Sequence, residues 1–523
     1  MMYSTPPLPT AQSKVIVIGA GLGGLACAMR LGAKGYAVTV LDKLDRVGGR
    51  GSSISQDGHR FDLGPTIVTV PQLYESLWAV CGRDFHADVD LRPIDPFYEI
   101  RWQDGTKFAA TGDTETMKAE VAKISPRDVK GYEKFLRGSK ARYKVGFEGL
   151  MTKPMHNIWE TIKVLPQFAW LRADRSIHAH AKSCVKDARL QMALSFHPLF
   201  IGGDPNNVTS IYALVGYLEK EFGVHYAMGG VQAIADAMAN VIRDQGGEIR
   251  HSVEVDEILV EGGKATGVRL MDGAEINAQI VVSNADAGHT YSRLLRNHTK
   301  RRWTDAKLKN RRWSMSLYVW YFGTKGTADK WKDVGHHTIV SGPRYAALLK
   351  DIFIKGKLAD DMSLYIHRPS LTDPSVAPDG DDTFYVLSPV PHLGWKDAVD
   401  WESEEPVYRE KVAAEIDKIM PGFRDHISTE TVFTPQTFRD RYLSPHGCGF
   451  SVEPRILQSA WFRPHNISEE VAGLYLVGAG THPGAGVPGV VGSAEVAAQL
   501  IPDAPHTAER ANDLSAHIQT AAQ

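Results

Sequence analysis

Cysteine is scarce in this sequence. Its 523 residues include only Cys27, Cys81, Cys184 and Cys448, which are far apart and form no C-x-x-C pair. A disulfide framework and a cysteine-rich zinc ribbon are therefore excluded. We expect the four side chains to be small buried hydrophobic groups in a protein from a reducing compartment.

An excess of charge of one sign is also missing. Lys and Arg together number 59 and Asp and Glu 61, for a net charge of −2, so we expect no nucleic-acid partner. No metal-ligand spacing is visible, and we expect no metal site. Residues 1–13 lack the features of a secretory signal. No run of about 18 apolar residues exists, which predicts no transmembrane helix.

The sequence does contain 43% hydrophobic residues, and it has a βαβ pattern near its start. Residues 14–19 read as a buried strand that ends in glycine, 22–34 as a helix and 37–41 as a second buried strand. Between the first strand and the helix, glycines at 19, 21 and 24 match G-x-G-x-x-G, a weak signal alone but typical of dinucleotide binding in this context.

Each part of this motif has a physical role. Gly19 permits the tight turn, Gly21 the approach of backbone to a pyrophosphate, and Gly24 close packing of helix on strand. A carboxylate after the second strand accepts hydrogen bonds from ribose hydroxyls and repels a 2′-phosphate, which favours FAD or NAD over NADP. The cofactor-binding residues expected here are Gly19, Ala20, Gly21, Gly23, Gly24, Asp42 and Lys43.

The next motif, R-V-G-G-R-G at 46–51, favours FAD over NAD, because an NAD domain more usually continues into a second crossover. Gly49 lets backbone lie under the cofactor, and Arg50 offers a guanidinium to phosphate or flavin oxygens. A strand and turn at 59–66 follow, and we expect Gly64, Pro65 and Thr66 near the flavin.

Two later sections repeat the α/β pattern. The middle one predicts a helix over 231–245 and strands over 253–260, 265–271 and 278–284. Its resemblance to the corresponding section of FAD-binding flavoproteins implies cofactor contacts at Val255 and Asn284. The last has a strand at 473–478, a glycine-rich loop and a helix over 490–501. Such a loop leaves backbone N–H groups uncovered for a pyrophosphate, ribitol or flavin carbonyl. The candidates there are Gly478, Gly480, Gly486, Val487 and Pro488.

These motifs, with S-F-H-P-L-F-I-G-G at 195–203 and W-F-R-P-H-N at 461–466, resemble those of bacterial-type phytoene desaturases. That family belongs to the FAD-dependent carotenoid desaturases within the flavin amine oxidase-like superfamily, and the resemblance covers about 14–501. Asp42 stands where many relatives carry Glu, and it keeps the carboxylate.

The resemblance implies FAD as sole cofactor and 15-cis-phytoene as substrate, dehydrogenated through phytofluene and ζ-carotene to neurosporene or lycopene. In the implied mechanism a hydride passes to flavin N5, a proton leaves the neighbouring carbon, and oxygen or a quinone reoxidises the flavin. It also implies peripheral attachment to the cytoplasmic side of a membrane, and a homo-oligomer is an open possibility.

The fold class we expect is α/β: a discontinuous Rossmann-like FAD-binding domain, a mixed α+β substrate domain and a helical membrane-contact subdomain. The corresponding divisions are 14–70, 226–290 and 446–501 for the first, 71–146 and 291–445 for the second, and 147–225 for the third. The ends, 1–13 and 502–523, are expected to be flexible. The aromatic run at 317–322 reads as a strand that lines either the substrate tunnel or a sheet core.

A C40 hydrocarbon has no polar atom, so its tunnel must recognise shape and open toward lipid. Within 147–201, apolar side chains alternate with basic ones, which suits a monotopic membrane contact; a packed helical subdomain with a solvated face is the alternative. The apolar set is Phe147, Leu150, Met151, Met155, Ile158 and Trp159, and the basic set is Lys153, Lys163, Arg172 and Arg175.

Candidates for a proton acceptor are weak. Glu160 and Lys163 are spaced to enter a cavity together from one helix, although a surface ion pair is the simpler interpretation. Asp286 and Arg463 are further candidates. His482 is one as well, although orienting the glycine loop is its simpler role.

Other functions stay open. These are a desaturase of a hydroxylated or methoxylated carotenoid, an isomerase, and a non-enzymatic prenyl-lipid-binding protein on the same fold. A flavin amine oxidase with a cysteinyl-flavin link is disfavoured because Cys448 lies far from the terminal loop.

Overall fold

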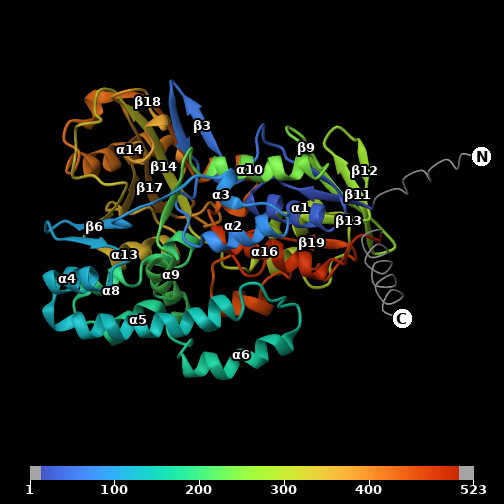
Figure 1. The fold of residues 1–523 in the computed structure, drawn as a ribbon, viewed down its shortest axis with the longest axis horizontal. Coiled ribbons are helices and arrows are strands. Elements are labelled where there is room, and N and C mark those ends of the chain that lie inside the picture. Colours follow the sequence, from blue (N-terminus) through green and yellow to red (C-terminus); the bar gives the residue numbers. More distant parts are fainter. Residues whose placement is uncertain (1–12, 506–523) are drawn as a thin grey trace, which may run out of the picture.

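A computed structural model describes residues 13–505 of the chain. Within it, five short strands from distant parts of the sequence form one parallel sheet (Figure 1). In order across the sheet they are β19 (Leu474–Leu476), β13 (Ile280–Ser283), β1 (Lys14–Ile18), β2 (Ala37–Leu41) and β9 (Glu248–Arg250). The three α/β sections thus share one sheet.

Three helices pack around this sheet and form its main core. Helix α1 (Leu22–Ala33) contacts both α16 (Val487–Leu500) and α10 (Val231–Asp244). Small buried side chains on α1, such as Ala26 and Ala28, let the helices approach closely. The last helix was expected to begin at residue 490. It begins three residues earlier, at Val487, because the fixed φ of Pro488 suits the first turn of a helix.

A three-stranded antiparallel sheet lies beside the parallel one, at the right of Figure 1. Its strands are β10 (Val255–Glu261), β11 (Lys264–Leu270) and β12 (Glu275–Asn277). The tight turns between these strands contain Gly262, Gly263 and Gly273, which all have positive φ. The first strand begins at Val255 rather than 253, because residues 253 and 254 lie in the connection from β9.

The largest sheet has seven strands and sits at the other end of the molecule. In order they are β18 (Ile427–Phe433), β14 (Ser316–Thr324), β17 (Asp382–Val390), β16 (Leu364–His367), β15 (His337–Ser341), β6 (Tyr98–Trp102) and β7 (Lys107–Ala110). The aromatic run at 317–322 is the buried strand β14. Tyr318, Trp320 and Phe322 pack with residues of helix α14 (Trp401–Asp417), so the run is largely sheet core, and only Leu317 of it reaches the cavity described below.

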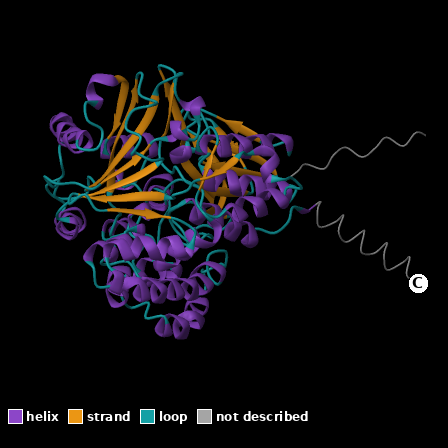
Figure 2. Cartoon of the chain, turned by 60° about the vertical axis from the view of Figure 1, so that its left-hand side comes forward, coloured by secondary structure: helices purple, strands orange, loops and turns teal. Residues whose placement is uncertain are grey.

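A layer of helices lies below the two sheets (Figure 2). It consists of α4 (Thr114–Ile124), α5 (Val129–Tyr143), α6 (Ile158–Trp170), α7 (Ile177–Cys184), α8 (Ala188–Ala193) and α9 (Val215–Phe222). Among the described residues, no helix is both long and apolar enough to cross a membrane.

Shorter elements connect these parts. The strand pairs are β3 (Ser53–Gln56) with β4 (His59–Asp62) and β5 (Leu91–Pro93) with β8 (His225–Ala227). The remaining α-helices are α2 (Pro71–Ala79), α3 (Phe85–Asp88), α11 (Ala287–His289), α12 (Asp305–Lys309), α13 (Tyr345–Lys350) and α15 (Pro435–Tyr442). The fold is that of the expected α/β class, whereas the exact domain boundaries stay a prediction. The flexibility expected for 1–13 and 502–523 falls almost wholly outside the described residues.

All four cysteines are free. Cys27 and Cys448 are buried as expected, and burial raises the pKa of each thiol to about 12. Cys81 and Cys184 are only half-buried, so the expectation of four buried side chains was wrong for these two. Both lie at the ends of surface helices, where one side of the residue faces solvent.

Candidate active site

A cavity of about 780 Å³ lies where the parallel sheet, the seven-stranded sheet and the helical layer meet. That volume falls in the range typical of sites for small molecules and cofactors. The glycine loops form one part of its wall, and side chains of the helical layer and the large sheet form the rest.

The N-terminus of α1 opens onto the cavity. Gly19 has a φ of +94°, and Gly21 starts the helix with no side chain to cap its first N–H groups. A Cβ at Gly24 would lie 2.1 Å from the carbonyl oxygen of Gly19, so only glycine fits there. With no acidic residue in the first turn, this helix end can take an anionic group such as a phosphate.

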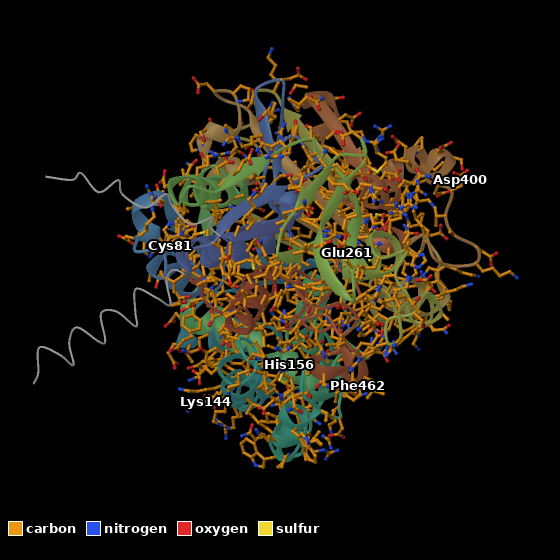
Figure 3. The ribbon with its side chains drawn as sticks, turned by 90° about the vertical axis from the view of Figure 1, so that its right-hand side faces the viewer. Cys81, Lys144, His156, Glu261, Asp400 and Phe462 are labelled. Carbon is orange, nitrogen blue, oxygen red and sulfur yellow. The ribbon has the colours of Figure 1, made fainter. Side chains whose placement is uncertain are left out.

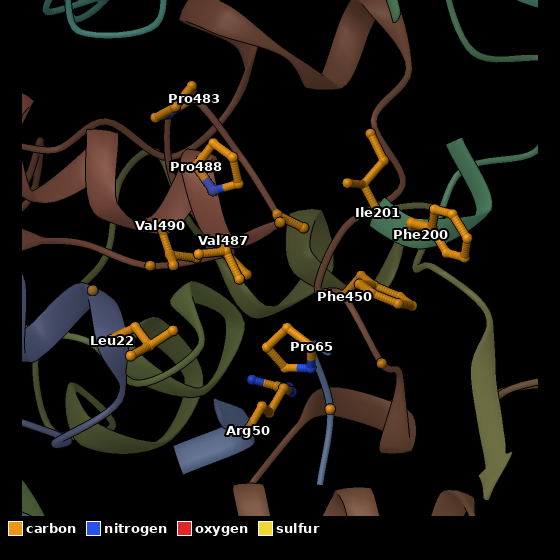
Figure 4. A pocket seen from close by; sticks show the side chains of 18 of the residues that line it. Leu22, Arg50, Pro65, Phe200, Ile201, Phe450, Pro483, Val487, Pro488 and Val490 are labelled. Carbon is orange, nitrogen blue, oxygen red and sulfur yellow. The ribbon is translucent and has the colours of Figure 1, made fainter. Parts of the chain in front are cut away.

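Helix α16 presents a second uncapped N-terminus to the same cavity. Gly486, with a φ of +94°, precedes it, and neither a side-chain cap nor an acidic residue occupies its first turn. Val487, Pro488 and Gly489 line the cavity. Figure 4 shows Val487 and Val490 near Leu22 of α1, so two positive helix ends converge on one place.

Asn284 holds the glycine loops together. Its Nδ2 donates to the carbonyl of Gly19 at 3.2 Å. A Cβ at Gly23 would lie 2.8 Å from its Oδ1, and one at Gly478 would lie 2.7 Å from the same atom. The sequence predicted Asn284 as a cofactor contact. It lines the cavity, and it also positions both loops.

Asp42 is buried at the end of β2 and lines the cavity. Its Oδ2 accepts from the N–H of Ala20 at 2.6 Å and its Oδ1 from that of Leu44 at 2.7 Å. Burial raises the pKa of this carboxyl, while the two hydrogen bonds work in the opposite direction. A carboxylate has further lone pairs, so both oxygens can still accept from a ribose. Lys43 beside it pairs with Glu254 at 3.6 Å.

Arg50 lies on the opposite wall. It donates to Ser444, and its guanidinium lies 5.4 Å from the ring centroid of Tyr442. Its Nε is buried without a hydrogen-bond partner, as expected of a group that awaits an acceptor. Figure 4 places Arg50 and Pro65 across the cavity from Pro483 and Pro488.

Most of the predicted cofactor residues meet at this cavity. Those that line it are Gly19, Gly21, Gly23, Asp42, Lys43, Gly49, Arg50, Gly64, Pro65, Thr66, Val255, Asn284, Gly478, Gly486, Val487 and Pro488. Ala20, Gly24 and Gly480 lie behind this wall. Gly24 and Gly480 are packed against Gly19 and Ala287, and Ala20 contacts Asp42.

Beyond the glycine loops the cavity becomes apolar. The side chains there come from the helical layer, from the 195–203 motif and from the seven-stranded sheet; they include Phe97, Phe147, Leu150, Met151, Phe168, Phe200, Ile211, Leu214, Ile339 and Leu387. Figure 4 shows the junction, with Phe200, Ile201 and Phe450 facing Val487. One cavity thus joins an anion-binding end to an apolar end.

The apolar end reaches the surface beside α6. No residue of this helix is buried, and Val164, Leu165 and Phe168 line the cavity. The helix contacts the short 3-10 helix Ala460–Phe462, and Figure 3 shows Phe462 at the helical layer. The exposed apolar residues here are Trp159, Ile162, Leu165, Trp170, Ile456 and Leu457.

Only part of the predicted apolar set lies at the surface. Leu150 and Met155 are buried, and Phe147 and Met151 line the cavity from within. Of that set only Trp159 is strongly exposed, at 63%. The exposed face instead continues along α6 to Trp170, which is 75% exposed.

Four of the five candidate proton acceptors do not reach the cavity. Glu160 and Lys163 form an exposed ion pair at 2.5 Å on α6. Asp286 caps α11 by accepting from Gly288 at 2.8 Å. Arg463 is buried, and its guanidinium donates to the carbonyl of Ala479 at 2.8 Å. Local hydrogen bonds and ion pairs already occupy these side chains, and for Glu160 and Lys163 the structure shows the surface ion pair that was the simpler interpretation.

His482 does line the cavity. Its Nε2 lies 2.9 Å from the carbonyl oxygen of Leu150, and this bond requires the proton on Nε2. Burial lowers its pKa to about 4, so the ring is neutral at pH 7. This geometry fits the orienting role, since the ring ties the glycine loop to the helical layer.

The sequence reasoning missed a buried polar cluster in the apolar end. The hydroxyl of Tyr98 lies 3.1 Å from His197 Nε2 and 3.2 Å from Glu219 Oε2, and His197 Nε2 lies 3.3 Å from Glu219 Oε2. All three residues line the cavity. His197 stands in a recognised motif, but no pattern in the sequence shows that Glu219 faces inward from α9.

Comparison with known proteins agrees with this geometry. The family model for flavin containing amine oxidoreductase matches residues 22–502. A phytoene desaturase (neurosporene-forming) of Cereibacter sphaeroides is 69% identical over 510 residues, which cover 98% of each chain. A phytoene desaturase (lycopene-forming) of a Paracoccus species is 43% identical over 493 residues, 94% of this chain and 97% of that one.

Solved structures show the same fold at lower identity. A variant of putrescine oxidase superposes with a TM-score of 0.63 and 15% identity, covering 93% of this chain and 98% of that one.

Proposed function

The chain belongs to the flavin containing amine oxidoreductase family, and from this premise we propose that it is an FAD-dependent desaturase of 15-cis-phytoene. As such it is an oxidoreductase that acts on CH–CH groups. The observation that carries the proposal is the continuity of one cavity from the two uncapped helix N-termini to an apolar chamber. A dinucleotide and a long hydrocarbon can meet only in such a space.

The residues present fit FAD as the flavin. The helix ends of α1 and α16 suit its pyrophosphate, and Asp42 suits the ribose hydroxyls of its adenosine half. FMN has no adenosine half for Asp42 and the β2 end to bind. When bound, the flavin supplies a two-electron acceptor for a hydride. Arg50 lines the same cavity, and its guanidinium is a suitable donor to flavin or phosphate oxygens.

The apolar chamber excludes water and recognises the substrate by shape. Each desaturation removes one hydride and one proton from adjacent carbons, so the proton needs a destination. We assign it to the buried cluster of Tyr98, His197 and Glu219, which supplies a carboxylate and an imidazole in an otherwise apolar wall. Of the candidates named from the sequence, only His482 lines the cavity, and its Nε2 is already engaged with the carbonyl of Leu150.

The surface around α6 suits contact with a membrane. Trp159, Ile162, Leu165 and Trp170 are exposed on a helix with no buried residue, and Lys153, Lys163, Arg172 and Arg175 are exposed nearby. Amphipathic helices of this kind insert into the lipid interface, and exposed cations favour anionic lipid. Phytoene then enters from the bilayer at the cavity mouth, and oxygen or a quinone is the terminal acceptor.

We propose neurosporene as the end product, after phytofluene and ζ-carotene. The relative at 69% identity carries the neurosporene-forming name, whereas the relative at 43% carries the lycopene-forming name.

Reconstitution tests this function. The protein is loaded with FAD, mixed with anionic liposomes that contain 15-cis-phytoene, and the products are read from their absorption bands. We expect neurosporene with FAD and none with FMN, NAD or no cofactor. Phytoene left unchanged despite bound FAD would refute the proposal, and phytoene bound without flavin would favour a lipid-binding protein. Conversion of only hydroxylated or methoxylated carotenoids would move the function to a later desaturase.

A further inference from the structure

Three histidines converge in the interior of the seven-stranded sheet. His337 on β15 pairs directly with His367 on β16, and His336 precedes β15. Their ring centroids lie 4.4 to 5.1 Å apart. The rings are buried, with 8%, 3% and 1% of His336, His337 and His367 exposed.

Four ring nitrogens in this cluster lack a hydrogen-bond partner. His336 uses Nδ1 to contact Thr372 Oγ1 at 2.6 Å, and His337 uses Nδ1 to contact the hydroxyl of Tyr365 at 2.7 Å. The Nε2 atoms of both rings and both nitrogens of His367 are buried and unpartnered. Buried polar atoms rarely lack a hydrogen-bond partner, so these four nitrogens indicate that the cluster binds a ligand.

We propose that His336, His337 and His367 bind one first-row transition-metal ion of the Zn²⁺ class. One nitrogen from each ring can be chosen so that all three lie within 4.8 Å of one another. Zinc–imidazole bonds measure about 2.0–2.1 Å, so a tetrahedral ion would draw the three nitrogens to about 3.3–3.4 Å from one another. Three imidazoles with an open position form an established zinc geometry.

The surroundings favour such an ion over a hydrated pocket. Burial lowers the pKa of His336 to about 3 and those of His337 and His367 well below the ordinary value, so their lone pairs are free at neutral pH. Metal-bound histidines typically fix their other nitrogen by a hydrogen bond, as Thr372 and Tyr365 do here. The buried carboxylate of Asp373 acts electrostatically on His336 and offsets part of the added charge.

The ion would brace the cavity wall. Tyr365, which contacts His337, also lies 2.6 Å from Thr66 Oγ1, next to Pro65 at the cofactor end. His337 and Tyr365 both line the cavity. A metal at the cluster would thus fix a chain of contacts from the large sheet to the loop that faces Arg50.

Metal content tests the proposal without recourse to activity. Flavin-loaded full-length protein is treated with a chelator, dialysed, and titrated with Zn²⁺ or Co²⁺, and bound metal is measured by mass spectrometry. We expect one equivalent per chain, and at least tenfold less in His367→Gln and His336→Gln. His392→Gln is the matched control, because His392 lies beside His446 in a pair outside the cluster, with ring centroids 5.8 Å apart.

A second measurement covers the case in which the cluster variants do not fold. X-ray absorption of the Zn²⁺-loaded wild-type protein should show three imidazole nitrogens at about 2.0–2.1 Å. The proposal is overturned if wild-type protein binds no equivalent of metal, if the metal it binds has only oxygen ligands, or if folded His367→Gln binds as much as wild type. If the wild-type protein binds no metal, ordered water would be the partner of the unpaired ring nitrogens.

Discussion

The side-chain amide of Asn284 lies so close to Gly23 that a Cβ there would come within 2.8 Å of Asn284 Oδ1. The same oxygen would lie 2.7 Å from a Cβ at Gly478. One side chain from the middle of the sequence thus sets the separation of the first and last glycine loops. The cofactor end of the cavity depends on that separation.

Gly23→Ala should therefore weaken flavin binding by at least tenfold, because Asn284 cannot withdraw without releasing Gly19 or pressing on Gly478. The measurement is the fraction of flavin retained after gel filtration, together with the Kd for FAD. Gly216→Ala in α9 is the control. A Cβ there meets only Phe135 Cε1 at 3.6 Å, and we expect normal flavin content.

Asp42→Asn should lower FAD affinity by roughly 10–100-fold. The change replaces a charge-assisted acceptor for two backbone N–H groups, and hydrogen bonds to charged groups contribute about 1.5–3 kcal/mol. Asp45→Asn, at an exposed pair with Arg46, should leave the Kd unchanged. Equal Kd values for the two variants would mean that Asp42 does not support the adenosine half.

Glu219→Gln should slow desaturation by roughly 10²–10⁴-fold, the usual contribution of a positioned general base, with flavin content intact. The measurement is the rate of flavin reduction by phytoene in liposomes. Glu221→Gln is the control, because Glu221 is exposed on the same helix. A wild-type rate in Glu219→Gln would show that the proton leaves by another route.

Replacing Trp159 and Trp170 together by serine should release the protein from anionic liposomes. Both side chains are exposed, so the double variant should keep its melting temperature and flavin. Met271→Ser removes a side chain that is 60% exposed on a turn far from α6 in sequence, and this control should stay bound. Co-sedimentation with the liposomes measures membrane binding of the wild type, the double variant and the control. Undiminished binding of the double variant would exclude α6 as the anchor.

The burial of His482 predicts a loss of stability at acid pH. Its folded pKa of about 4 lies below the value of about 6.5 for an unfolded chain, so between these values the unfolded state binds the extra proton. The contribution of the neutral His482 ring to the free energy of unfolding is complete above pH 6.5 and is lost as the pH falls through 4. The stability difference between wild type and His482→Asn should shrink by about 3 kcal/mol from pH 7 to 4. A difference independent of pH would contradict this.

The first βαβ unit could be predicted almost to the residue, because its buried strands and G-x-G-x-x-G turn are local signals. The three glycine-bearing sections were correctly assigned to one fold, since each ends a strand and begins or precedes a helix. Local patterns also predicted Gly486 and Pro488 as residues of the cofactor site, although they did not predict that the helix begins at Val487.

The features that the sequence did not predict depend on contacts between segments that are distant along the chain. The inward direction of Glu219 depends on how α9 packs, and the pairing of His337 with His367 depends on the register of β15 and β16, which no spacing in the sequence shows. Glu160 was chosen by its spacing from Lys163, and Asp286 and Arg463 by residue type, but each of these side chains already has a local partner. The apolar pattern at 147–159 did not show which side chains face the cavity and which face solvent.

The central claim is that flavin and hydrocarbon share one cavity, and an anaerobic single turnover tests it most directly. FAD-loaded protein is mixed with phytoene-containing liposomes in the absence of oxygen and quinone. It should lose its visible flavin absorbance and form one new carbon–carbon double bond per flavin reduced. Unchanged absorbance with phytoene present, or product formed without flavin reduction, would contradict the account.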